Sequence, residues 1–243
     1  MTGKIDEGTA DDAVQTDLRF ERVAGRRRTT MPSELEADTM PTLTATKPAC
    51  YWPLPTPEEV FRISVDRYDR MLESGSLGED DPIELLSGVI VWKMPKNPKH
   101  STVVRRCQRL IEGLIPAGWH VRKEEPVRIP DYDEPEPDLA VIRGDDRLYE
   151  NQHPGPRDVG LIIEVAESSL TRDRGLKREI YARAGIPAYW VVNLVDRQVE
   201  SYADPVGGAY PAPKVLSESD SVELIIEGDM AGLISVADLL TRP

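Results

Sequence analysis

Residues 159–166 read VGLIIEVA, the longest apolar run in the chain, and Glu164 is its only charged residue. Neighbouring side chains of a strand point to opposite faces, so Ile162, Glu164 and Ala166 share one face. Because the run is apolar on both faces, it predicts a strand in the middle of a sheet. A carboxylate buried there is costly unless it is paired, hydrogen-bonded or bound to a metal. Glu164 is therefore the first candidate for a functional site.

Helix and strand patterns alternate on both sides of this run. Helical spacing predicts helices over 56–74, from Pro98 to about 114, over about 171–184 and near 235–240. Alternating or apolar runs predict strands at 83–86, 89–92, 120–129, 138–143, 160–166, 189–195, 198–204 and 222–226. Ser87-Gly88 and Asp196-Arg197 are suited to tight hairpin turns. The order of elements predicts an α/β fold.

Length and composition favour a single globular domain, because 40% of the 243 residues are hydrophobic and 30% are charged. Residues 1–52 lack a sustained apolar period, so we expect a disordered, mobile tail before a domain over 53–243. No apolar run is long enough for a membrane span, and the N-terminus does not read as a secretory signal, which predicts a cytoplasmic protein. Neither Cys50 nor Cys107 has a CxxC partner, so we expect no disulfide framework and no zinc knuckle.

The formal net charge of −13 argues against a protein that coats nucleic acid through its overall charge. The basic residues are nevertheless grouped in two segments, which could form local basic faces. These groups are Lys99, Arg105, Arg106 and Arg109, and then Arg172, Arg174, Lys177, Arg178 and Arg183.

A second carboxylate belongs to the stretch EPEPDLAVIR at 134–143, where a charged loop delivers Asp138 to the start of an apolar strand. If this strand is the antiparallel neighbour of the strand that carries Glu164, both acids lie at the same end of the sheet. Two close carboxylates repel, and a divalent cation removes that repulsion. Mg²⁺, with Mn²⁺ as a substitute, is the expected ion because it takes one or two protein carboxylates and fills its other positions with water and phosphate oxygens.

A positive group follows on the next helix. Asp173 and Lys177 are four residues apart, on the face shared with Ile180 and Tyr181. Lys177 is therefore expected to lean toward the sheet. An ammonium beside a metal-bound water would lower the pKa of that water and offset negative charge in the transition state.

The motifs together resemble those of the PD-(D/E)xK nucleases, and within that superfamily those of the Uma family of endonucleases. The resemblance covers about residues 53–240. The matching motifs are IELLSG at 83–88, a following Pro-x-His at 98–100, PEPDLAV at 135–141, IIEVAESS at 162–169 and DRGLKREIYARAGIPAYWVVN at 173–193.

This resemblance implies a restriction-endonuclease-like fold, a central mixed sheet flanked by helices, with a divalent metal and DNA as substrate. Glu84 would be the early acidic residue, Asp138 and Glu164 the metal ligands, and His100 a recurrent family histidine. Lys177 would be a lysine moved onto the helix, because Ala166 occupies the usual lysine position. Ser87 and Val89 depart from the family, whose members often have Asp and Glu there, which puts a second metal position in doubt.

Each assignment has a plainer interpretation. Asp138 could cap a loop, Glu164 could pair with an arginine, and Glu84 could be an ordinary charge at a strand end. Asp173 and Lys177 could form a helix-surface pair, and His100 could be a hydrogen-bonded structural residue.

The function expected from the sequence is that of a Mg²⁺-dependent endonuclease acting on DNA. In this hypothesis Asp138 and Glu164 hold the ion, and Glu84 is the third residue of the metal site, where it supports the ion or its water. Lys177 assists the attacking water. A silent binding module for DNA or a protein partner is the main alternative, and hydrolysis of RNA or a nucleotide is a third. A homodimer is plausible, because nucleases that cut both strands often pair two active sites.

Overall fold

A computed structural model describes residues 56–78 and 80–241, so the expected tail and Cys50 lie outside the described residues. The helices are η1 Pro57–Glu59, α1 Val65–Glu73, α2 Pro98–Glu112, η2 Asp146–Tyr149, η3 Pro156–Asp158, α3 Leu170–Arg172, η4 Asp173–Lys177, α4 Arg178–Arg183 and α5 Val236–Leu239. The strands are β1 Ile83–Leu86, β2 Val89–Trp92, β3 Trp119–Lys123, β4 Leu139–Arg143, β5 Val159–Ala166, β6 Ala188–Asn193, β7 Gln198–Ala203, β8 Lys214–Ser217, β9 Ser221–Ile226 and β10 Asp229–Ser235. No helix among these residues is long and apolar enough to cross a membrane.

The main sheet contains six of the described strands, in the order β3-β4-β5-β6-β7-β8. Only β5 and β6 run parallel, joined by the crossover through α3, η4 and α4, and the other neighbours are antiparallel. All eight residues of β5 are buried. The predicted mixed sheet, the central position of this strand and its antiparallel pairing with β4 are confirmed.

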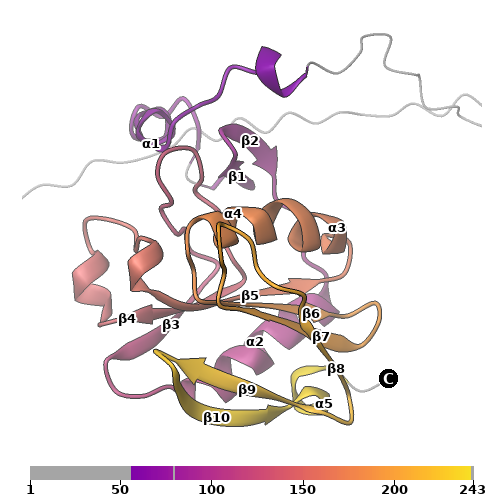
Figure 1. The fold of residues 1–243 in the computed structure, drawn as a ribbon. Coiled ribbons are helices and arrows are strands. Elements are labelled where there is room, and N and C mark those ends of the chain that lie inside the picture. Colours follow the sequence, from indigo (N-terminus) through magenta and orange to yellow (C-terminus); the bar gives the residue numbers. More distant parts are fainter. Residues whose placement is uncertain (1–55, 79, 242–243) are drawn as a thin grey trace, which may run out of the picture. The chain divides into compact units, whose positions relative to one another are not determined.

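Different elements cover the two faces of the sheet (Figure 1). On one face, α2, the β9–β10 hairpin and α5 pack against Leu161, Ile163 and Val165 of β5. On the other face, α4 packs against Ile162 and Ala166. The alternation that the sequence predicts for β5 therefore serves two hydrophobic cores, and Glu164 lies on the α4 side.

The β1–β2 hairpin turns at Ser87 and Gly88, as predicted. Both residues have positive φ, 51° and 77°, the combination that a tight two-residue turn requires. A Cβ at Gly88 would also lie 2.7 Å from the Cβ of Arg62, so no larger residue fits without a shift. The same hairpin packs against Val65 and Tyr68 of α1.

Two element boundaries differ from the sequence prediction. The helix expected over 56–74 is only the short η1 followed by α1 from Val65, because the backbone N–H of Ile63 donates to the Gly88 carbonyl at 2.8 Å and keeps that segment extended. The strand expected over 120–129 ends at Lys123, because Glu124 has a φ of 56° and Pro126 has no N–H to continue a ladder.

The helix expected over 171–184 is present at 170–183, but its middle, η4, is a π-helical turn. The hydroxyl of Tyr189, on β6, donates to the carbonyl of Asp173 at 3.1 Å, inside this turn. Such turns are rare and often mark functional sites. This one carries both Asp173 and Lys177.

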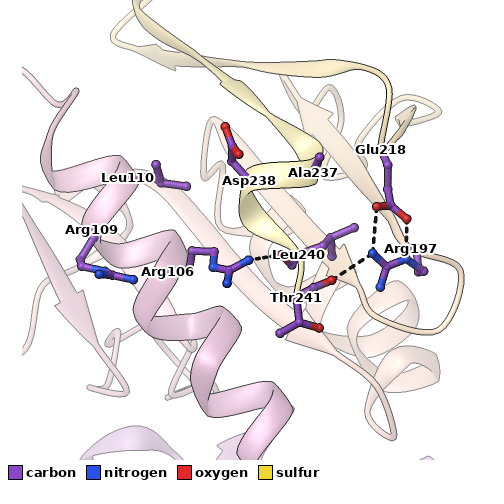
Figure 2. Close-up of a pocket in the computed structure, with 9 residues that line it drawn as sticks. All are labelled: Arg106, Arg109, Leu110, Arg197, Glu218, Ala237, Asp238, Leu240 and Thr241. Atoms are coloured by element: carbon purple, nitrogen blue, oxygen red, sulfur yellow. Dashed lines mark hydrogen bonds and ion pairs between the residues drawn. The ribbon is translucent and has the colours of Figure 1, made fainter. Parts of the chain in front are cut away.

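Two arginines hold the C-terminal segment (Figure 2). Arg106 of α2 donates to the Leu240 carbonyl, and Arg197 donates to the Thr241 carbonyl at 3.0 Å while pairing with Glu218. They line a cavity of about 580 Å³ between α2 and α5. Arg106, one of the grouped basic residues, therefore serves the fold rather than an open basic face.

Glu134 allows a pH test of the fold. Its side chain is 3% exposed, and its Oε2 has no hydrogen-bond partner among the described residues. Burial, with a contribution from Asp69, raises the pKa of Glu134 from 4.5 to about 7.

Because the folded protein holds the proton of Glu134 more tightly than the unfolded chain does, the free energy of unfolding should fall as the pH rises from about 4.5 to about 7. In Glu134→Gln, melting temperatures measured between about pH 5 and about pH 8 should fall less than in the wild type. Equal falls would contradict this assignment.

Candidate active site

A cavity of about 60 Å³ lies where the β1–β2 hairpin, the start of α2, the ends of β4 and β5, and the α3–η4 segment meet. All five residues proposed from the sequence line it. The lining residues are Glu84, Lys93, Met94, Lys96, His100, Glu124, Glu136, Asp138, Glu164, Ser169, Arg172, Asp173 and Lys177. Residues from distant parts of the chain thus meet at one place, as the hypothesis required.

Asp138 and Glu164 are brought together by the antiparallel pairing of β4 and β5. Leu139 lies opposite Ile163, which puts the preceding Asp138 beside Glu164. The Asp138 backbone N–H lies 3.4 Å from Glu164 Oε2, and the Val165 N–H donates to Asp138 Oδ2 at 2.8 Å. Their exposed fractions are only 8% and 4%. Asp138 therefore does more than cap a local loop.

Lys177 is the cation that faces these acids. Its Nζ lies 2.9 Å from Glu164 Oε1 and 3.0 Å from Glu84 Oε2, and the Tyr181 hydroxyl donates to Glu164 Oε1 at 2.9 Å. Glu164 is thus paired with a lysine rather than with an arginine. Burial opposes the charged form of Lys177, but the neighbouring carboxylates outweigh it and raise its pKa above the usual value. The surrounding carboxylates therefore favour the ammonium form of Lys177.

Glu84 joins the same site from β1. Its side chain is 2% exposed and pairs with Lys177, so it is not an ordinary strand-end charge. The Glu136 backbone N–H donates to Glu84 Oε2 at 3.2 Å, and Arg172 Nη1 lies 3.5 Å from Oε1.

His100 sits in the first turn of α2, where the Asn97 side chain accepts from its backbone N–H. Its Nε2 lies 3.1 Å from Asp138 Oδ2, and its buried Nδ1 has no partner among the described residues. Burial alone would lower the pKa of His100, but the Asp138 carboxylate outweighs this and raises it. His100 is held directly behind one of the proposed metal ligands.

Asp173 is a fourth acid that the sequence reasoning did not assign to the site. It is 2% exposed, and its buried Oδ2 has no hydrogen-bond partner within the described part of the chain. Burial raises the pKa of Asp173, and Lys177 opposes that shift. The interpretation of Asp173 and Lys177 as a helix-surface pair is wrong, because η4 faces both into the cavity. The four-residue spacing that puts Asp173 on the same helical face as Lys177 was the sequence signal that could have assigned Asp173 to the site.

The site holds an excess of carboxylate. Burial raises the pKa of Glu164, the charges of Asp173, Asp138 and Glu84 raise it further, and Lys177 opposes the shift. This crowding, together with the orphaned Asp173 Oδ2, fits a hard cation with oxygen ligands. Within the described residues, however, no three acidic, His or Cys side chains are arranged as a metal-binding group. At most two carboxylates are available as direct ligands in this arrangement, which Mg²⁺ tolerates.

Comparison with known proteins identifies the family. The Uma2 family model, described as "Putative restriction endonuclease", matches residues 65–235. The chain belongs to the Uma2 family. The predicted resemblance is thereby confirmed.

One solved structure supports the fold of this Uma2 protein. The crystal structure of a "putative nuclease belonging to DUF820" from Anabaena variabilis matches with a TM-score of 0.55 and 19% sequence identity. The match covers 73% of this chain and 97% of that one. At this identity the similarity establishes the architecture and not the chemistry. None of the curated proteins matches the chain.

Another buried carboxylate of this Uma2 chain, Glu200, anchors the π turn from outside the cavity. Glu200 of β7 is 3% exposed and accepts two bonds of 2.9 Å from Arg174 Nε, with a third of 2.5 Å from Nη2. Asn193 and Tyr202 also donate to it, at 3.0 and 3.2 Å. Burial would raise the pKa of Glu200, but the hydrogen bonds from Arg174 and Asn193 lower it. Arg174 directly follows Asp173, so this clamp fixes the turn that presents Asp173 and Lys177.

Removing the clamp should destabilise the fold. Arg174→Ala leaves the buried Glu200 without its cation, and we expect a loss of about 2 kcal/mol in the free energy of unfolding, measured in urea. Lys214→Ala is the control, because it removes the cation from Glu223 in an exposed pair of 3.7 Å between β8 and β9. The control should cost clearly less. Equal losses in the two variants would show that the burial of Glu200 adds nothing to the cost of removing its arginine.

Proposed function

We propose that this Uma2 protein is a Mg²⁺-dependent endonuclease that hydrolyses phosphodiester bonds in DNA. The observation that carries the proposal is the convergence of Glu84, Asp138, Glu164 and Lys177, from four separate segments of the chain, at one cavity, where Lys177 pairs with Glu84 and Glu164. Four buried acids that face the buried Lys177 and the partly exposed Arg172 are costly for a fold that has no use for them. Membership of the Uma2 family, whose model is described as "Putative restriction endonuclease", supports this reaction class.

Asp138 and Glu164 are the proposed ligands of the ion. Among the described residues, Glu164 Oε2 has only the long 3.4 Å contact to the Asp138 N–H. It therefore keeps capacity for a cation while Oε1 holds Lys177 and Tyr181. When bound, the ion would supply an acidified water and stabilise charge on the phosphate. Glu84 would support this arrangement by sharing Lys177.

Lys177 and His100 have different proposed roles. Because its pKa is raised, Lys177 stays protonated, orients the attacking water by donating to it, and offsets negative charge on the phosphate. His100 touches Asp138 through Nε2 and is proposed to orient that carboxylate, as groups behind metal ligands commonly do.

A cleavage assay tests the proposal. Purified protein should nick or cut DNA with Mg²⁺ or Mn²⁺ and stop in EDTA. Asp138→Asn and Glu164→Gln should each lower the rate by about 100-fold or more, because they remove a proposed ligand charge. Glu223→Gln is the control: it makes the same change of charge on an exposed side chain of β9 and should leave the rate unchanged. Full activity in both ligand variants, with circular dichroism showing them folded, would refute the assignment.

A silent binding module is the second candidate. The lack of a three-residue metal group in the described residues favours it. Calorimetric titration separates the two functions: an enzyme should bind Mg²⁺ and lose that binding in Asp138→Asn, whereas a silent module needs no such site. Parallel assays on DNA, RNA and nucleotides decide the substrate.

The homodimer is proposed because of the reaction, cleavage of both DNA strands, and not because of any contact between two copies of the chain. One site cuts one strand, so a double-strand cut in a single encounter would need two copies. Sedimentation of the protein with and without DNA measures this directly.

A further inference from the structure

Three lysines spaced three residues apart lie on the segment that carries Lys93, Lys96 and His100 to the candidate active site. Lys93 and Lys96 line the cavity, and Lys99 lies in the first turn of α2. We call these three the lysine strip. The strip lies on the segment that leads from β2 into α2, so it runs beside His100.

Each lysine of the strip is paired with a glutamate that lies close to the end of β3, the start of β4 or the end of β5. Lys93 Nζ lies 2.6 Å from Glu136, and Lys96 Nζ lies 3.0 Å from Glu124. Lys99 Nζ lies 3.9 Å from Glu167. The six side chains are between 21% and 41% exposed, so these are solvent-accessible pairs of the weak kind.

The position of the strip matters because the cavity floor is acidic. A phosphodiester approaching Asp138, Glu164 and Asp173 is repelled unless cations meet it first. The start of α2 adds a partial positive charge to the same rim. In a chain of net charge −13, a cationic rim of this kind is what a polyanionic strand would need.

We propose that the lysine strip binds the DNA backbone on either side of the scissile phosphate, and that Glu124, Glu136 and Glu167 occupy the phosphate positions in the free protein. This rests on the proposed function in taking DNA as the ligand. A phosphate replaces a carboxylate of the same charge on each lysine. The three glutamates therefore compete with DNA for the lysines. In this way a protein of negative net charge can still have a local binding site for DNA.

Two kinds of variant distinguish a lysine strip that binds DNA from lysines that only hold a loop in place. In the lysine variant, Lys93→Gln, Lys96→Gln and Lys99→Gln are combined. In the acid variant, Glu124→Gln and Glu136→Gln are combined. The matched controls are Lys214→Gln and Glu223→Gln, which alter an exposed lysine–glutamate pair of 3.7 Å between β8 and β9.

Binding of the full-length protein to a labelled DNA duplex is measured by fluorescence anisotropy in EDTA, over a range of salt concentrations. The lysine variant should bind about 10-fold or more weakly, and its slope of log affinity against log salt should fall by about 0.9 for each phosphate that a lysine no longer neutralises. The acid variant should bind several-fold more tightly. Both controls should match the wild type.

The proposal is overturned if the lysine variant keeps the wild-type slope, if the acid variant does not gain affinity, or if a control shifts affinity as much as the strip does. No DNA binding by the wild type also overturns it. Because the assay contains no metal, the result is independent of cleavage: loss of Mg²⁺-dependent cleavage with intact strip-dependent binding would refute the proposed enzyme but not the strip. The acid variant is expected to gain affinity, so a folding defect in the lysine variant cannot imitate the full pattern.

Discussion

The ion pair between Glu164 and Lys177, 2.9 Å long and almost fully buried, is the interaction on which the rest of the site depends. It joins the central strand β5 to the crossover that leads to its parallel neighbour β6. Removing one partner of such a pair typically costs about 3–5 kcal/mol, because the other charge is left uncompensated. The carboxylate in the sheet and the lysine on the helix therefore require each other.

The geometry of the crossover follows from this constraint. The π-helical turn η4 presents Asp173 and Lys177 together to the cavity, and its two ends continue as ordinary helix. From the opposite side, Glu200 holds Arg174 with three hydrogen bonds. The Tyr189 hydroxyl at the Asp173 carbonyl and Glu200 at Arg174 together fix the position of this turn. The carboxylates that Lys177 does not neutralise then favour the binding of a cation at the site.

The charges of this Uma2 chain are sorted by location. Carboxylates gather at the buried floor of the site, whereas the partly exposed Lys93 and Lys96 line the same cavity. Several arginines have structural partners instead, such as Arg106 at the C-terminal segment and Arg174 at Glu200. The net charge of −13 is thus a poor guide to the field at the site. Local arrangement decides what a cavity attracts, since screening limits the reach of distant charges.

The resemblance to a known family implied the mixed sheet. The sequence by itself determined the central position of β5, the β1–β2 and β6–β7 hairpins and, given antiparallel pairing of the two strands, the meeting of Asp138 with Glu164. These depend on local patterns: an apolar run, a turn dipeptide and the pairing of adjacent strands. Only the tertiary structure decided the late start of α1, the π turn and the burial of Asp173. Each of these depends on a partner distant in sequence, such as the Gly88 carbonyl for Ile63, or Tyr189 for the Asp173 carbonyl. Local periodicity carries no record of such contacts.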